Sequence, residues 1–290
     1  MSSLVSAPTQ LRLMKGAAAI PQVIWWPLGQ LASLVLAARP PKPLRQWALN
    51  AGVVTGRSPS YWQRRAAQFS WIRNSVGSLQ LGRWSKRRIL NTVRWVDDGR
   101  ARIERLQAER GVVLALPHMG SWDLVAAYGG SIGLPLSSVA ERLPAGQFEY
   151  FRDLRAALGV EIQTYGEPNV VAALCDDLRR GRLVCLVADR DFGRRGLPVR
   201  WPTPDGGRDL TMPAGPVIIA QQTGAALMGA ATTFEGSCLR VVVGEPIPLR
   251  AGAEGAEQMA QELAEFFTTQ VSAKPTDWHM MQKFFPGVVA

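Results

Sequence analysis

The sequence of 290 residues is poor in cysteine and histidine, and its first third contains almost no acidic residues. Three cysteines form an odd, widely spaced set, which excludes a disulfide framework and offers no metal-ligand spacing. Two of them lie in apolar surroundings and are interpreted as buried thiols, so we expect the protein to work in a reducing compartment. With only His118 and His279 present, a histidine-rich metal site is excluded.

Charge is divided unevenly along the chain. Residues 1–110 hold 18 Lys and Arg against 4 Asp and Glu, a net charge of +14, and the first acidic residue is Asp97. Residues 111–290 hold 15 against 19, a net charge of −4. Seven of the ten tryptophans also lie in the first 110 residues. Basic side chains attract anionic surfaces and tryptophan favours the water–hydrocarbon boundary, so we predict that this region docks on an anionic membrane.

Two other interpretations of the basic region stay open. The first is a set of basic helices with buried tryptophans and no lipid partner. The second is nucleic-acid binding, but no recognised nucleic-acid motif accompanies the charge. We therefore expect a membrane surface as the partner and no nucleic acid.

Residues 17–38 form a strongly apolar segment without any charged side chain. Their length permits a membrane span, but Pro21 and Pro27 oppose it because proline interrupts an isolated helix. The basic residues ahead of the segment also resemble a signal sequence, although the apolar stretch is long and interrupted. We expect a kinked helix that lies in one leaflet, with a true span as the alternative.

The remaining pattern predicts helices first and then alternating strands and helices. The first helices are expected at 44–56, 59–79, 84–95 and 97–110. Short apolar runs typical of buried strands follow at 111–117, 136–140, 160–165, 183–188, 225–231 and 239–243. Helical stretches are expected at 121–131, 146–158, 169–180, 213–223 and 254–271.

This alternation predicts an α/β fold with a central mixed or parallel sheet flanked by helices. We expect residues 1–110 to form a basic, Trp-rich, helical and membrane-associated region. Residues 111–290 should form the α/β core. Because no low-complexity linker separates the two parts, we expect one continuous structural domain.

His118 stands where α/β enzymes place their chemistry. It directly follows the predicted strand 111–117, and Ser121 and Asp123 open the next helix. A neutral imidazole can take a proton from an attacking hydroxyl, and a carboxylate can hold its tautomer. We predict His118 as general base with Asp123 as one candidate partner. The alternatives are a buried, satisfied histidine and a carboxylate that only favours the helix dipole.

A second candidate partner follows another predicted strand. Asp189 comes directly after 183–188, so its carboxylate can reach His118 if the two strands are neighbours. The adjacent Arg190 can hold a phosphate or carboxylate through two parallel hydrogen bonds. An ordinary surface turn fits the same residues. Spacing alone does not choose between Asp123 and Asp189.

Several charged residues near the predicted strand ends are candidates for substrate binding. They are Glu141, Arg142, Arg155, Arg190, Arg195 and Arg208. The last two belong to a basic, glycine-rich loop that suits a phosphate-bearing donor or a lipid headgroup, although a solvated loop fits equally. His279 has no strand-end setting and is predicted to be structural.

Together these segments resemble a known superfamily. A histidine and an aspartate separated by four residues, as in His118 and Asp123, are similar to the motif of glycerolipid acyltransferases. Further matching segments are 139–143 (VAERL), 189–192 (DRDF), 212–216 (MPAGP) with 223–227 (TGAAL), and 277–282 (DWHMMQ). With the basic front end they resemble the lipid A acyltransferase-like branch and, within it, the phosphatidylinositol mannoside acyltransferases, over residues 15–285.

The resemblance implies a peripheral enzyme on the cytoplasmic face of the inner membrane. It would move a long, palmitoyl-like chain from acyl-CoA to a mannose hydroxyl of a phosphatidylinositol mannoside. His118 matches the general base and Asp123 its motif partner, while Glu141 and Arg155 match a charged lining. At Asp189 the family is expected to carry glutamate in the catalytic dyad. The shorter aspartate either reaches His118 through a backbone shift or leaves the orienting role to Asp123. No metal or organic cofactor is implied, since acyl-CoA is a substrate.

Other functions stay open. A lipid A-type or lysophospholipid acyltransferase differs only in its acceptor, which the sequence encodes poorly. An acyl-CoA thioesterase would use the same base to activate water. A non-catalytic binder would not need His118 at all.

Overall fold

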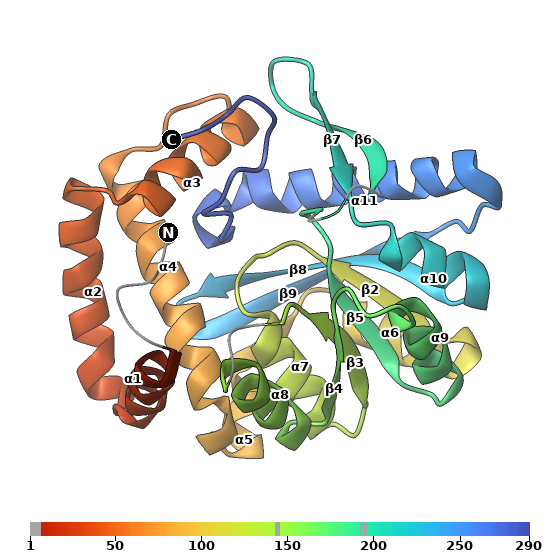
Figure 1. Cartoon of the computed structure of the whole chain (residues 1–290), viewed down its shortest axis with the longest axis horizontal. Coiled ribbons are helices and arrows are strands. Elements are labelled where there is room, and N and C mark those ends of the chain that lie inside the picture. Colours follow the sequence, from red (N-terminus) through yellow and green to blue (C-terminus); the bar gives the residue numbers. More distant parts are fainter. Residues whose placement is uncertain (1–6, 143–145, 192, 194–195) are drawn as a thin grey trace.

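A seven-stranded sheet with helices on both faces forms the centre of the protein (Figure 1). The computed structural model describes residues 7–142, 146–191, 193 and 196–290. The sheet contains β1 (Val93–Trp95), β2 (Val112–Leu116), β3 (Leu136–Ala140), β4 (Val160–Thr164), β5 (Leu183–Val187), β8 (Ala226–Glu235) and β9 (Cys238–Ile247). Its order is β1-β9-β8-β2-β5-β3-β4, and only β8 and β9 pair antiparallel. This mixed sheet confirms the predicted fold class.

Helices precede the sheet and then alternate with its strands. They are α1 (Ala7–Ala19), α2 (Gln22–Ala38), α3 (Lys42–Thr55), α4 (Tyr61–Gln80), α5 (Lys86–Thr92), α6 (Gly99–Arg110), α7 (Trp122–Ser131), α8 (Gln147–Ala157), α9 (Val170–Arg179), α10 (Gly215–Thr223) and α11 (Gly252–Ala273), with short 3-10 turns at Leu81–Arg83 and Pro275–Asp277. Most predicted ranges agree with these bounds to within a few residues.

Two predicted ranges are wrong in part. The helix expected at 84–95 ends at Thr92, and residues 93–95 form β1, because Val93 and Trp95 suit an extended edge strand beside β9. The stretch around Arg208, expected to be a basic, glycine-rich loop, contains the strand β6 (Leu197–Trp201), which pairs with β7 (Arg208–Met212) in a separate antiparallel hairpin.

Strand β2 contributes side chains to two of the hydrophobic cores, because successive residues of a strand point to opposite faces. Val113 and Ala115 pack in the core formed with α9, α10 and α11. Val112, Leu114 and Leu116 pack in the core formed with α6 and α7. All five are buried, which explains why the strand lacks polar alternation.

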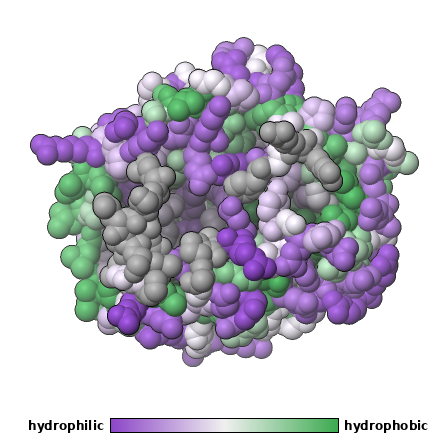
Figure 2. Space-filling model, in the orientation of Figure 1, coloured by the Kyte–Doolittle hydropathy of each residue, from purple (hydrophilic) through white to green (hydrophobic). Residues whose placement is uncertain are grey.

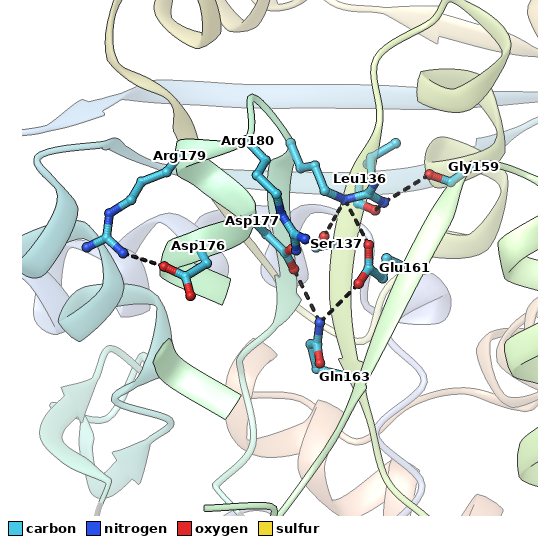
Figure 3. A network of polar contacts seen from close by, with 10 residues as sticks. Leu136, Ser137, Gly159, Glu161, Gln163, Asp176, Asp177, Arg179 and Arg180 are labelled. Carbon is cyan, nitrogen blue, oxygen red and sulfur yellow. Dashed lines mark hydrogen bonds and ion pairs between the residues drawn. The ribbon is translucent and has the colours of Figure 1, made fainter. Parts of the chain in front are cut away.

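A polar network ties β3, β4 and β5 to one another and to α9 (Figure 3). Arg182, just before β5, donates to Ser137 Oγ at 2.7 Å and lies 3.5 Å from Glu161. Gln163 donates to Glu161 at 3.5 Å and to the buried Asp177 at 3.4 Å. Arg182, Ser137 and Glu161 lie near the amino ends of these strands, whereas His118 and Asp189 follow the carboxyl ends of β2 and β5.

The apolar segment 17–38 is not one kinked helix. The chain breaks between α1 and α2 at Pro21, which cannot donate a backbone hydrogen bond, and Pro27 lies inside α2. Among the described residues, no helix combines the length and the apolar character that a membrane crossing needs.

Candidate active site

His118 and Asp189 meet at the carboxyl ends of the neighbouring strands β2 and β5. The Nδ1 atom of His118 lies 2.5 Å from Oδ1 of Asp189, and the backbone N–H of His118 donates to Oδ2 at 3.0 Å. Asp189 is fully buried, whereas 28% of the His118 side chain is exposed. The aspartate therefore fixes both the ring and the backbone of His118 and leaves Nε2 available to a substrate.

Asp189 is held as a carboxylate inside the protein. Burial by itself raises its pKa, but the attraction of His118 and the hydrogen bonds from His118 and Trp278 outweigh it, so the pKa lies below the usual value. The Trp278 Nε1–H donates to Oδ2 at 2.9 Å. With three donors on two oxygens, the carboxylate can turn very little.

The loop after β2 is shaped by Gly120 and Thr232. Gly120 has a φ of 62°, and a Cβ there would lie 2.3 Å from the Thr232 carbonyl oxygen. The Thr232 hydroxyl donates to the Met119 carbonyl at 2.6 Å and accepts from the Ser121 N–H at 3.0 Å. Only glycine fits this approach, and it lets the chain pass from His118 into α7.

The C-terminal segment forms the second wall of the loop. The Gly120 N–H donates to the Asp277 carbonyl at 2.8 Å, and the His279 N–H donates to the His118 carbonyl at 2.7 Å. Ser70 of α4 donates from its hydroxyl to Asp277 Oδ1 at 2.6 Å. The position of His118 therefore depends on residues from the front, middle and end of the chain.

His279 lies beside His118 but in a different setting. Its Nε2 is 3.0 Å from Ser70 Oγ, and its Nδ1 is buried without a hydrogen-bond partner among the described residues. Burial, with a smaller effect of His118, lowers the pKa of His279 to about 3. The ring of Trp122 lies 5.7 Å from that of His118 and 6.1 Å from that of His279, measured between centres. A neutral, enclosed imidazole agrees with a structural role.

Asp123 pairs with Arg155 and not with His118. Arg155 Nε donates to Asp123 Oδ1 at 2.8 Å, and its Nη2 lies 3.4 Å from Oδ2. Together with Trp122 the pair borders a cavity of about 70 Å³ between α7 and strands β3, β4 and β5. This space equals about two water molecules, so the described state leaves no room there for a long acyl chain.

The other candidate binding residues are spread around this end of the sheet. Arg142 pairs with Glu167, Arg190 donates to Gln282, and Arg208 pairs with Asp205 at the start of β7. Burial lowers the pKa of Arg190, and the attraction of Asp189 and of the exposed Glu141 partly offsets this. Arg195 lies outside the described residues. In the structure Glu141 therefore acts on Arg190 through electrostatic attraction. Arg208 lies apart from them, on the β6–β7 hairpin.

One surface depression lies away from His118. It has a volume of about 580 Å³, lies between the β6–β7 hairpin and α11, and is lined by residues such as Arg200 and Glu257. Since none of the residues around His118 lines it, we do not assign the chemistry to this depression.

Three residues around the dyad were not predicted from the sequence. They are Ser70, Thr232 and Trp278. The only signal for Trp278 was its place in the DWHMMQ segment, which contributed to the resemblance but carried no role. The other two lie in ordinary helix and strand sequence, where no local pattern marks a contact with a distant loop.

Comparisons with known proteins identify the family. Residues 69–286 match the model of the family described as bacterial lipid A biosynthesis acyltransferase. Phosphatidylinositol mannoside acyltransferases from Mycobacterium tuberculosis (strain CDC 1551 / Oshkosh) and Mycolicibacterium smegmatis are 38% and 37% identical over 180 residues, 61% of this chain. The matched stretch spans about half of these relatives, 55% and 57% of their lengths. The resemblance of the motifs is confirmed, and the chain belongs to the bacterial lipid A biosynthesis acyltransferase family.

Proposed function

We propose that this protein is an O-acyltransferase that moves a fatty acyl chain from a thioester to a hydroxyl of a lipid-linked acceptor. The observation that carries the proposal is the contact between His118 Nδ1 and the buried Asp189, in a histidine whose side chain is 28% exposed, so that Nε2 is the ring nitrogen left for a substrate. Such a pair is suited to remove a proton from a hydroxyl and to stabilise the imidazolium that forms.

The reaction needs a group that moves one proton and a group that stabilises the oxyanion of the intermediate. The acceptor hydroxyl gives its proton to Nε2 of His118 while its oxygen attacks the thioester carbonyl. The tetrahedral intermediate then collapses, the C–S bond breaks, and the imidazolium returns the proton to the leaving thiolate. The start of α7, four residues beyond His118, supplies the positive end of a helix dipole for the oxyanion.

The names of the relatives suggest the acceptor. We take a mannose hydroxyl of a phosphatidylinositol mannoside as the acceptor, since proteins of that name share 37–38% identity with this chain. Acyl-CoA as donor, a palmitoyl-like chain and the absence of a metal or organic cofactor are further parts of the proposal. Lipid A-type and lysophospholipid acceptors, and water in a thioesterase, are the alternatives.

The surface of α2 supports a membrane location. Its outward side chains include Ile24, Leu28, Leu31 and Val35, which are exposed at helical spacing. Figure 2 shows hydrophobic side chains along the edge of the molecule where α2 lies in Figure 1. With the basic residues of the first 110 positions, this face suits a helix lying on an anionic leaflet. We propose the cytoplasmic face of the inner membrane.

A labelled-acyl assay tests the proposal. Purified protein is incubated with radiolabelled palmitoyl-CoA and vesicles that contain phosphatidylinositol mannoside, and lipid product and free fatty acid are measured separately. We expect lipid product from the wild type and a loss of about 10²–10⁴-fold in His118→Ala. A variant that keeps more than a tenth of the turnover would count against His118 as base. Release of fatty acid alone would indicate a thioesterase.

A further inference from the structure

A second cavity lies close to the candidate active site. It has a volume of about 370 Å³ and lies between α2, α4, α5 and the β8–β9 hairpin. Its wall includes Ser121 and Leu124, so it reaches the start of α7, just beyond the loop that carries His118. A cavity of this size can hold the polar headgroup of a lipid.

Arg73 of α4 faces this cavity in an aromatic setting. Its guanidinium lies 3.9 Å from the ring centre of Phe234 and 5.2 Å from that of Trp26. One nitrogen, Nη1, donates to the Gly236 carbonyl at 2.8 Å. Burial lowers the pKa of Arg73 to about 10, partly offset by the attraction of Asp277. The half-buried charge therefore has no ion-pair partner among the described carboxylates.

Arg88 of α5 lines the same cavity. Its guanidinium lies 3.8 Å from the ring of Trp84, and its Nη2 donates to the side chain of Gln22. Burial lowers its pKa as well. In the described part of the chain, neither Arg73 nor Arg88 forms an ion pair with a carboxylate.

Asp277, the carboxylate that attracts Arg73, already accepts hydrogen bonds from other groups. Asp277 accepts hydrogen bonds from the Ser70 hydroxyl at 2.6 Å and from the Phe234 N–H at 2.7 Å, one on each oxygen. It acts on Arg73 only through space. Two guanidiniums thus line one cavity without an ion pair to any described carboxylate. Arginine suits a phosphate there because its planar fork can donate to two phosphate oxygens at once.

Helix α2 indicates where the chains of a bound lipid would lie. Trp25 and Trp26 line the cavity, while Ile24 and Leu28 of the same helix are exposed and apolar. A lipid whose chains lie against the outer face of α2 would bring its headgroup to the mouth of the cavity. We propose that the cavity binds the phosphate ester of the acceptor lipid headgroup through Arg73 and Arg88. This inference rests on the proposed function, because it names the recognition site of that acceptor.

Direct binding tests the site without turnover. The water-soluble dihexanoyl phosphatidylinositol is titrated into the wild type and into Arg73→Gln and Arg88→Gln by calorimetry. We expect the dissociation constant to rise about tenfold or more in each variant, since each loses a charge-assisted contact. Arg94→Gln, which removes an exposed charge on β1 outside the cavity, should leave it unchanged.

Further measurements make the test specific to this cavity. Arg88 is exposed, so Arg88→Gln keeps the test valid even if Arg73→Gln fails to fold. Unchanged binding in Arg88→Gln, or an equal loss in Arg94→Gln, would overturn the proposal. Titration with free coenzyme A distinguishes the source of the phosphate: if the variants lose coenzyme A binding but keep the phospholipid, the cavity serves the donor and the proposal is wrong.

The outcome is independent of catalysis. His118→Ala should bind dihexanoyl phosphatidylinositol as tightly as the wild type, because its side chain does not line the cavity. If lipid binds through both arginines and no acyl transfer is found, the proposed function fails while this site stands. If acyl transfer occurs and both arginine variants keep the wild-type KM for the acceptor, only the site is overturned.

Discussion

Asp189 and Asp123 carry the same carboxyl group in two electrostatic settings. Asp189 is fully buried and receives hydrogen bonds from the ring and backbone of His118 and from Trp278. Asp123 is paired with a permanent cation, Arg155. The positive charge of Arg155 cancels most of the attraction that Asp123 could exert on an imidazolium. Asp189 is therefore the better orienting group for His118.

We expect Asp189→Asn to lower turnover about 10²–10⁴-fold, because an amide cannot accept from both donors of His118 and hold its tautomer. Asp123→Asn should lower turnover less than about tenfold, since it breaks an ion pair that does not touch His118. Steady-state acyl transfer at saturating substrates measures both. Circular dichroism melts establish that each variant is folded at the assay temperature. If Asp123→Asn is the more damaging change, the assignment of Asp189 is wrong.

At the scale of elements, the junction between β2 and α7 depends on a close backbone approach. Gly120 takes a φ of 62° and lies against Thr232 of β8. Gly133, which follows α7, takes a similar φ of 80° but has no heavy atom near the position of a Cβ. Substitution of the two glycines by alanine therefore separates the cost of backbone strain, which both positions share, from the cost of a steric clash, which only Gly120 has.

We expect Gly120→Ala to lower the free energy of unfolding by about 3 kcal/mol or more, from backbone strain and the clash together. Gly133→Ala should cost only about 1 kcal/mol, because strain alone acts there. Urea unfolding of both variants measures the difference. Equal losses would show that the approach of Thr232 relaxes easily and does not shape the loop.

The exposed face of α2 leads to a prediction on membrane binding. Leu28 and Leu31 are 58% and 60% exposed, so replacing both by glutamine should leave the fold intact. If each leucine contributes about 1 kcal/mol by insertion, Leu28→Gln/Leu31→Gln should weaken binding to anionic vesicles about 30-fold. Vesicle co-sedimentation measures the effect.

Leu249→Gln serves as the control, since this exposed leucine lies between β9 and α11, far from α2 in Figure 1. High salt should also weaken binding of the wild type, because the Debye length falls to about 3 Å at 1 M. Binding that ignores both salt and the α2 changes would mean that another segment docks on the membrane.

At the scale of the whole molecule, α3 and α4 meet the C-terminal segment beside His118. Asn50 of α3 donates to the carbonyls of Met280 and Gln282 at 2.9 and 2.8 Å, and Ser70 of α4 holds Asp277. In Figure 1 the C-terminal segment leaves α11 near α4 and ends close to α3. Unfolding of either end should therefore disturb the dyad.

This arrangement predicts how stability depends on pH. His279 has a folded pKa of about 3 against about 6.5 in the unfolded chain, so the unfolded state binds more protons between these values. The contribution of His279 to the free energy of unfolding should be fully present above pH 6.5. As the pH drops toward 3, the free energy of unfolding should fall by up to about 1.4 kcal/mol per pH unit because of this group. Burial raises the pKa of Asp277 and acts in the opposite direction.

Comparison with His279→Gln isolates the histidine. The glutamine amide can still donate to Ser70, but it does not titrate. Urea unfolding at pH 7 and pH 5 should show a larger loss of stability in the wild type than in the variant. Equal losses would mean that His279 can be protonated in the folded protein.

Most elements of the sheet could be predicted because buried strands need uninterrupted apolar runs, as in β2 and β5. The edge strand β1 was not predicted, because three residues directly after a helix are too few to show the alternation of apolar and polar residues that marks a strand. The hairpin of β6 and β7 was also missed, because its arginines, glycines and prolines are equally typical of a loop.

The sequence by itself determined the α/β class, the basic front end and the position of His118 at a strand end, because these depend on local periodicity and composition. Only the tertiary structure decided which carboxylate pairs with His118. That choice follows from the adjacency of β2 and β5 in the sheet, which set Asp189 beside the imidazole and left Asp123 to Arg155. Contacts between residues far apart in sequence depend on strand order and packing, and no local pattern records them.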